Sequence, residues 1–173
     1  MKTIIFSILA LSLIAGTSCQ DKTELSNEQK ETIENEIKDQ QNQFLTTLNQ
    51  LNIDSFPEFW NTDEMPSSVS DMTYFPMSTL VDSALYWFSL RERQHLEQRE
   101  LKITALTPDI ALMTNEIIWE VWMKSGKYSK SKVIATLIWK KKQDGWKVIH
   151  LHENIRGIEE NKSFGEKESE TKD

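Results

Sequence analysis

The chain has 173 residues, a formal net charge of −7 and a single cysteine. An acidic chain without a basic stripe is a poor candidate for binding nucleic acid or anionic lipid headgroups. One cysteine excludes an intrachain disulfide, so the fold has to be held by packing, to which six tryptophans contribute large apolar side chains. No glycine-rich phosphate loop is present in the sequence, and we predict no cofactor.

The N-terminus has the pattern of an export signal. Lys2 precedes an apolar stretch over residues 4–15, which is shorter than the roughly 20 residues that a helix needs to cross a bilayer. Small residues and then Cys19 follow, and they resemble the lipobox of a bacterial lipoprotein. We therefore expect a signal peptide over 1–18 and a membrane anchor in the bacterial cell envelope through lipidated Cys19, with a tether over 19–26. The alternative is ordinary cleavage and a secreted or periplasmic protein.

Helical signals dominate the first part of the chain. Ser26 and Gln29 form a capping-box pattern, and apolar residues then recur at helical spacing, which predicts a helix from residue 27 to about residue 50. A second capping pattern with a proline in its first turn predicts a short helix near residues 55–60.

The next segment is less regular. Residues 61–70 are polar and are expected to form a loop, followed by a short strand over 72–75. Thr79 and Asp82 offer a cap for an amphipathic helix that ends near Arg93.

Near His95 the hydrophobic spacing changes from about 3.6 residues to two, which is typical of strands. Strands are predicted at 101–105, 110–123, 133–139 and 146–155, with turns at 107–109, 125–126 and 144–145 between them. The second of these is apolar on both faces and is therefore expected to be central. The prediction is an α+β domain over 27–157, in which helices precede an antiparallel meander sheet, with a disordered acidic tail over 158–173.

Three stretches of the strand region carry a family resemblance. Residues 144–152, Asp-Gly-Trp-Lys-Val-Ile-His-Leu-His, are similar to the closing strand of the nuclear transport factor 2-like superfamily, in particular its SnoaL-like bacterial branch. Residues 107–113 resemble a hairpin of the same family, and the run from Thr136 to Lys141 resembles its penultimate strand.

This resemblance implies a cone in which the curved sheet wraps around the helices and leaves an apolar pocket at its open end. Some members of the family are enzymes, among them ketosteroid isomerases, dehydratases and polyketide cyclases, whereas others bind ligands or partners without chemistry. Many members dimerise through the outer face of the sheet. Because one fold serves all these roles, the activity has to be argued from the site.

Two histidines are the first candidates for the site. His150 and His152 lie two residues apart on a predicted strand, so we expect both on one face together with Trp146 and Val148. They are interpreted as polar residues that line the end of the cone, or as an acid–base pair. A metal site would need Glu116 as a third ligand, and no metal site is predicted.

The enzymes of the family use a pocket carboxylate, often with a tyrosine or histidine that steadies an oxyanion. The carboxylate candidates here are Asp82, Glu116 and Glu120, and the donor candidates are Tyr74 and Tyr86. Asp82 is also interpreted as a helix cap. Glu116 interrupts an otherwise apolar strand, and it lies either in the pocket with a partner or on the solvated outer face.

Tryptophans on the strands are expected to form the core and the wall of the cone. We predict a ligand-binding pocket lined by Trp119, Trp139 and Trp146 with the two histidines. Ile118 and Trp122 share the other face with Glu116, and if that face is the outside, they favour a homodimer.

Three functions follow from these observations. The first is a membrane-tethered module without catalytic activity, which binds a small apolar molecule or a protein partner in its cone. The second is a SnoaL-like lyase or isomerase that uses His150 or His152 with a pocket carboxylate. The third is a structural dimerisation module whose cone is filled by side chains.

Overall fold

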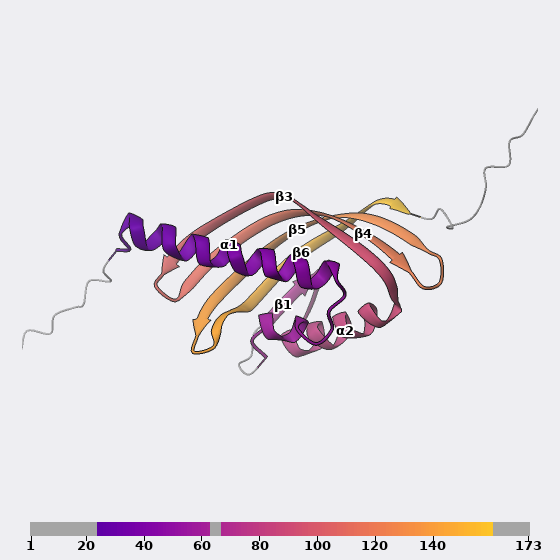
Figure 1. Ribbon diagram of the computed structural model, residues 1–173, viewed down its shortest axis with the longest axis horizontal. Helices are drawn as coiled ribbons and strands as arrows, with labels where there is room; N and C mark the ends of the chain where they lie inside the picture. Colours follow the sequence, from indigo (N-terminus) through magenta and orange to yellow (C-terminus); the bar gives the residue numbers. More distant parts are fainter. Residues whose placement is uncertain (1–23, 63–66, 161–173) are drawn as a thin grey trace, which may run out of the picture.

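The computed structural model describes residues 24–62 and 67–160. Its elements in chain order are α1 (Asn27–Asn49), the 3-10 helix η1 (Phe56–Phe59), β1 (Ser67–Ser70), β2 (Thr73–Pro76), α2 (Met77–Leu90), β3 (Arg91–Thr107), β4 (Ile110–Met123), β5 (Tyr128–Lys142) and β6 (Gly145–Glu160). The strands form one curved, unclosed sheet, and α1 lies along its concave side (Figure 1). The predicted signal peptide and Cys19 lie outside the described residues. None of the described helices is long and apolar enough to span a bilayer.

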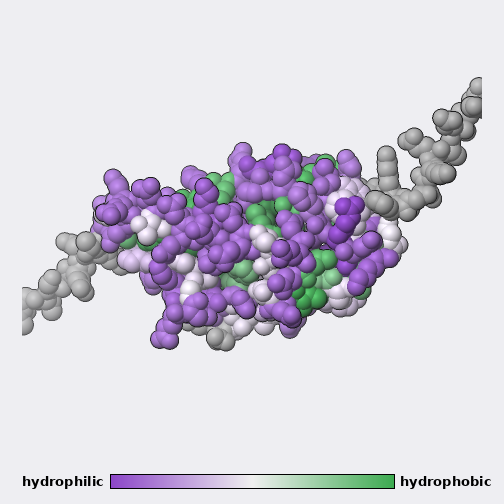
Figure 2. Space-filling view, viewed as in Figure 1, coloured by the Kyte–Doolittle hydropathy of each residue, from purple (hydrophilic) through white to green (hydrophobic). Residues whose placement is uncertain are grey.

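Helix α1 forms where the sequence predicts it, and the reason is the capping box. The Ser26 side chain accepts a hydrogen bond from the backbone N–H of Gln29, and the Gln29 side chain accepts one from the backbone of Ser26. The buried stripe of the helix, which includes Ile33 and Ile37, faces the sheet. Its opposite face is largely hydrophilic, with hydrophobic surface showing in smaller areas (Figure 2).

A polar clamp joins α1 to the hairpin between β5 and β6. The carboxylate oxygen Oε2 of Glu36 accepts hydrogen bonds from Lys141 Nζ and from Trp146 Nε1, each at 2.7 Å. The Lys141 ammonium also lies 5.5 Å from the centre of the Trp146 ring. Glu36 thereby ties the middle of the helix to the turn between the last two strands.

Helix α2 begins earlier than predicted. Its N-cap is Pro76, which offers no side-chain oxygen to the first turn, and the fixed backbone of this proline starts the helix at Met77. Asp82 therefore lies inside the helix with an exposed side chain, so its interpretation as a helix cap is wrong. The helix ends at Leu90 and the chain enters β3 directly, with the backbone N–H of Arg91 bonded to the Phe88 carbonyl.

The antiparallel meander of β3, β4, β5 and β6 is confirmed, and the sheet extends beyond it. The strand order is β2-β1-β6-β5-β4-β3, and β1 pairs with β6 in parallel, so the sheet is mixed. The segment 61–70 was expected to be a loop because serines favour turns. Backbone pairing with β6 instead draws Ser67–Ser70 into the sheet.

The last strand is both longer and less regular than predicted. It continues to Glu160, past the expected domain boundary at 157. It also contains a β-bulge, because His150 pairs with Ile138 whereas Val148 pairs with Trp139, which leaves Ile149 as the extra residue. A bulge reverses the alternation of faces. The expectation that His150 and His152 share a face with Trp146 and Val148 is therefore wrong.

The convex face of the sheet is partly polar. Trp122 lies there between the guanidinium of Arg93, 3.6 Å from its ring centre, and the ring of Tyr128 at 5.2 Å. Ile118 and Trp122 are only half-buried. A homodimer through this face stays a prediction.

Candidate functional site

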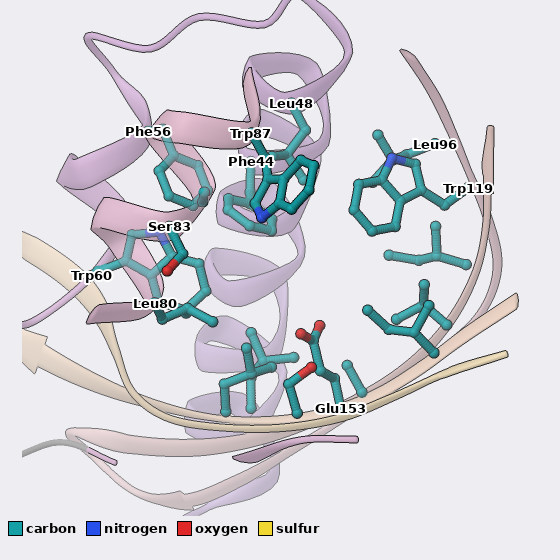
Figure 3. Close-up of a pocket in the computed structure, with 18 of the residues that line it drawn as sticks. Phe44, Leu48, Phe56, Trp60, Leu80, Ser83, Trp87, Leu96, Trp119 and Glu153 are labelled. Carbon is teal, nitrogen blue, oxygen red and sulfur yellow. The ribbon is translucent and has the colours of Figure 1, made fainter. Parts of the chain in front are cut away.

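A cavity of about 410 Å³ opens between the concave face of the sheet and the helices. Its wall takes side chains from α1, η1, α2 and all six strands. Most of these side chains are hydrophobic, among them Phe44, Leu48, Phe56, Trp60, Leu80, Trp87, Leu96, Ile117 and Trp119 (Figure 3). A volume of a few hundred Å³ with a mainly apolar lining is typical of a small-molecule pocket. The cone is therefore hollow in this protein, contrary to a purely structural module with a filled core.

Aromatic packing fixes one wall of this cavity. Phe44 on α1 contacts the rings of Phe59 at 5.2 Å and Trp60 at 5.6 Å between centres. Phe56 contacts Phe88 of α2 at 5.0 Å in an edge-on arrangement. Such pairs are worth about 0.5–1.5 kcal/mol each beyond the area they bury. The wall is therefore preformed rather than assembled by a ligand.

Glu153 is the carboxyl group of the cavity. It projects from β6 and its carboxylate points into the hollow (Figure 3). Burial raises the pKa of Glu153 above its usual value, the hydrogen bond with Ser70 opposes this shift, and the negative charge of Asp71 adds to it. The amide of Asn115 also lines the cavity, and its Oδ1 is buried without a hydrogen-bond partner among the described residues.

Arg91 brings a positive charge to the same cavity. The residue is 9% exposed, and its guanidinium lies 5.1 Å from the Phe88 ring centre and 4.7 Å from that of Trp119. Arg91 Nη1 donates to Gln94 Oε1 at 2.7 Å, and Trp119 Nε1 donates to the same oxygen at 3.1 Å. Burial lowers the pKa of Arg91 to about 10, so the group is cationic at neutral pH.

Gln94 connects this group to α1. Its Nε2 donates a hydrogen bond to the Leu48 carbonyl near the C-terminal end of the helix. Gln94 is itself buried, and hydrogen bonds within the protein satisfy both its amide oxygen and its amide nitrogen. The contact holds Arg91 and Trp119 in a fixed orientation toward the cavity.

The predicted pocket residues lie in different parts of the structure. Trp119 lines the cavity, whereas Trp139 is fully buried in the core and Trp146 belongs to the clamp with Glu36. His150 and His152 lie on the convex face because of the bulge. His150 Nδ1 is 3.1 Å from the hydroxyl of Ser67 on the neighbouring strand, and His152 is exposed.

The predicted acid–base residues also lie outside the cavity. Glu116 forms an ion pair with Lys132 at 2.6 Å on the convex face, which is the solvated position that the sequence left open. Glu120 on the same face accepts a hydrogen bond from Tyr128 at 2.7 Å, which lowers the pKa of Glu120. Tyr74 is 71% exposed and Tyr86 is 61% exposed.

Glu153, Arg91 and Asn115 line the cavity but are not predicted from the sequence. Glu153 interrupts the apolar alternation of Leu151 and Ile155, which is the signal that could have identified it once the bulge was known. The described residues contain no group of three or more histidine, cysteine, aspartate or glutamate side chains placed to hold a metal ion.

This arrangement offers three kinds of interaction to a bound molecule. The aromatic and aliphatic walls bury apolar surface, the guanidinium of Arg91 attracts a negative charge, and the Glu153 carboxyl group accepts or donates a proton. The cavity contains no histidine among its lining residues.

Solved structures with the same architecture come from several bacteria. A nuclear transport factor 2-like superfamily protein from Salmonella enterica aligns with a TM-score of 0.63 and 13% identity, over 76% of this chain and 95% of that chain. A hexachlorocyclohexane dehydrochlorinase from Novosphingobium barchaimii aligns with a TM-score of 0.59 and 12% identity, over 79% and 93% of the two chains. A protein with a cystatin-like fold from Caulobacter vibrioides gives 0.59 and 17%, over 72% and 89%. At these identities the likeness establishes the fold alone.

Sequence comparison supplies the family. No curated protein matches this sequence significantly. The profile of the SnoaL-like domain matches residues 37–155, which span most of α1, all of α2 and the sheet as far as the cavity residues of β6. Together with the hollow cone, this match indicates a protein of the ligand-binding or lyase/isomerase type. The chain belongs to the SnoaL-like domain family, and its fold is that of nuclear transport factor 2-like proteins.

Proposed function

We propose that this protein is a cell-envelope lipoprotein whose cone binds one small, largely apolar molecule and does not transform it. The observation that carries the proposal is the open cavity of about 410 Å³ with its preformed aromatic wall. Apolar surface removed from water contributes roughly 25 cal/mol per Å², so a ligand that fills such a cavity has ample driving force.

The positions of the candidate acid–base residues support a protein that binds its ligand without transforming it. His150, His152, Glu116 and Tyr74 all lie away from the cavity lining. The two ionisable groups that do line it are Glu153 and Arg91, and an arginine at a pKa of about 10 is a poor proton carrier at neutral pH.

The envelope part of the proposal is supported by the sequence. The apolar stretch over 4–15 and the small residues before Cys19 have the order of a lipoprotein signal. The capped start of α1 at Asn27 leaves a short segment between Cys19 and the folded domain. Acyl chains on Cys19 would hold the cone close to a membrane.

A titration with N-phenyl-1-naphthylamine, a neutral apolar fluorophore, tests the binding proposal. We expect saturable binding with quenching of tryptophan emission, because Trp87 and Trp119 line the cavity. The variant Ala84→Trp places an indole in the cavity from α2 and should abolish binding. The matched control Ser78→Trp adds the same side chain at an exposed position of the same helix, outside the lining, and should bind normally. Equal binding by both variants would contradict the proposal.

A second function, proton transfer as in a lyase or isomerase, is favoured by one observation. The Glu153 carboxyl group faces an apolar cavity, and burial raises its pKa, which is the direction of shift that a carboxyl acid or base in an active site needs. Native mass spectrometry of the purified protein, followed by extraction of the bound molecule, separates the two functions. A co-purifying molecule that is recovered unchanged after prolonged incubation with fresh protein supports binding. Conversion that is lost in Glu153→Gln supports catalysis.

A further inference from the structure

Arg91 is a buried cation that has no counter-ion among the described residues. The residue is 9% exposed, and no carboxylate lies within ion-pair distance of it in the part of the chain that the structure describes. Buried charges in proteins are normally paired, because removing an ion from water is costly unless a partner compensates it. Arg91 therefore lacks the negatively charged partner that a buried arginine normally has. Such a partner can lie on the side of Arg91 that faces the cavity.

Packing explains where Arg91 lies but leaves most of its hydrogen-bonding capacity uncommitted. A positive charge at this position is favoured by the rings of Phe88 and Trp119 and by the C-terminal end of α2. Gln94 Oε1 is the single side-chain acceptor recorded for the guanidinium within residues 24–62 and 67–160. A guanidinium has five N–H donors in a planar fork, which matches the two oxygens of a carboxylate.

We propose that Arg91 binds the carboxylate of the ligand, and that the ligand is therefore a compact apolar monocarboxylic acid. This inference rests on the proposed binding function and names its ligand class. The apolar body lies against Trp87, Trp119 and the aromatic wall, where few polar groups are available to it. The carboxylate lies against the guanidinium, where it replaces hydration with charge-assisted hydrogen bonds.

The rest of the cavity favours one negative charge rather than two. The Glu153 carboxyl group also lines the cavity, and the carboxylate of Asp71 lies close enough to influence it. A second carboxylate on the ligand would meet like charge at this position. A dicarboxylic acid or a phosphate is thus disfavoured against a monoanion.

The inference is tested with three probes that share a naphthalene body: 2-naphthoate, neutral 2-naphthylmethanol and 2-naphthylmethylammonium. Affinities are measured by isothermal titration calorimetry at pH 7. We expect the wild-type protein to bind the anion about 10- to 100-fold more tightly than the alcohol, as hydrogen bonds to charged groups imply. The ammonium should bind most weakly of the three.

Two variants test whether Arg91 causes the preference for the anion. Arg91→Met should remove the advantage of the anion while the affinity for the alcohol changes by less than about threefold, because the apolar stem is retained. The control Arg93→Met deletes the same charge on the convex face, where Arg93 stacks on Trp122, and should keep the wild-type ratio. A purely structural role of Arg91 would weaken all three probes equally in Arg91→Met.

The outcomes separate the inference from the proposed function. If the alcohol binds as tightly as the anion in the wild type, or if Arg91→Met keeps the anion preference, the carboxylate assignment is wrong although the cavity still binds ligands. If N-phenyl-1-naphthylamine binds but none of the naphthalene probes does, the assignment is also wrong. Should Arg91→Met fail to fold, the wild-type ratio and the Arg91→Lys variant, which keeps the charge but loses the fork, decide.

Discussion

Removing the Glu36 carboxylate should loosen the attachment of α1 to the β5–β6 hairpin. Glu36→Ala deletes the acceptor of two hydrogen bonds of 2.7 Å, one from Trp146 Nε1 and one from Lys141 Nζ. Trp146 is only 4% exposed, so its N–H would lose its partner in a place that water reaches poorly.

The expected cost follows from these two contacts. An unsatisfied buried donor costs about 1–3 kcal/mol. The ion pair adds little, because the side chains of Glu36 and Lys141 are 38% and 44% exposed and exposed pairs are worth about 0.2–1 kcal/mol. We therefore expect Glu36→Ala to lower the free energy of unfolding by about 1–3 kcal/mol. Glu36→Gln keeps an acceptor and should cost about 1 kcal/mol or less.

Urea unfolding followed by tryptophan fluorescence measures this difference. The control is Glu31→Ala on the same helix, where the glutamate is exposed and no contact of its side chain is recorded among the described residues. The bonds from Lys141 and then Trp146 lower the pKa of Glu36 below its usual value of 4.5. The advantage of wild type over Glu36→Ala should thus be complete above pH 4.5 and decline as the pH falls through the lowered pKa.

Equal free energies of unfolding for Glu36→Ala and Glu31→Ala would refute the clamp. A difference that stays unchanged as the pH falls through the lowered pKa of Glu36 would refute its electrostatic explanation, because protonation removes the negative charge that pairs with Lys141.

Two further predictions concern Glu153 and Cys19. Because the folded protein raises the pKa of Glu153 above 4.5, the protonated group stabilises the fold at low pH and this contribution is lost as the pH rises through the raised value. Glu153→Gln should accordingly be more stable than wild type at pH 7 and equal to it near pH 4, as urea unfolding at both pH values would show. Equal stability at pH 7 would argue against a carboxylate whose ionised form is destabilised by burial. Cys19→Ser should move the protein from the membrane fraction to the soluble fraction of expressing bacteria, and a variant that stays membrane-bound would exclude the lipid anchor.

Much of the fold follows from local signals. The capping box at Ser26 fixes the start of α1, and the glycines at 126 and 145 take positive φ angles of 82° and 116° in two of the three predicted turns. The doubly apolar stretch of β4 is paired on both sides, by β3 and β5, although in the full sheet it lies next to the edge strand and its convex face is only half-buried. These features can be predicted from the sequence because they depend on residues that are neighbours in the chain.

The errors arise where distant contacts override local preference. Ser67–Ser70 has little strand propensity, yet the free edge of β6 recruits it by backbone pairing. The proline at 76 starts α2 before the polar residues that resemble a cap. Arg91 lies at the point where a helix becomes a strand without a loop, so neither periodicity marks it as facing the cavity.

The extra residue at Ile149 decides which chemistry the hollow receives. With it, the residues aimed inward at the end of β6 are Leu151 and Glu153; in an unbroken strand the inward set would be His150 and His152. A single deletion in this ribbon would thus exchange a carboxyl group for two imidazoles, while every other wall of the chamber stayed in place. Relatives that carry the same two-histidine motif can differ in reactivity through backbone register alone, without any substitution at the reacting position.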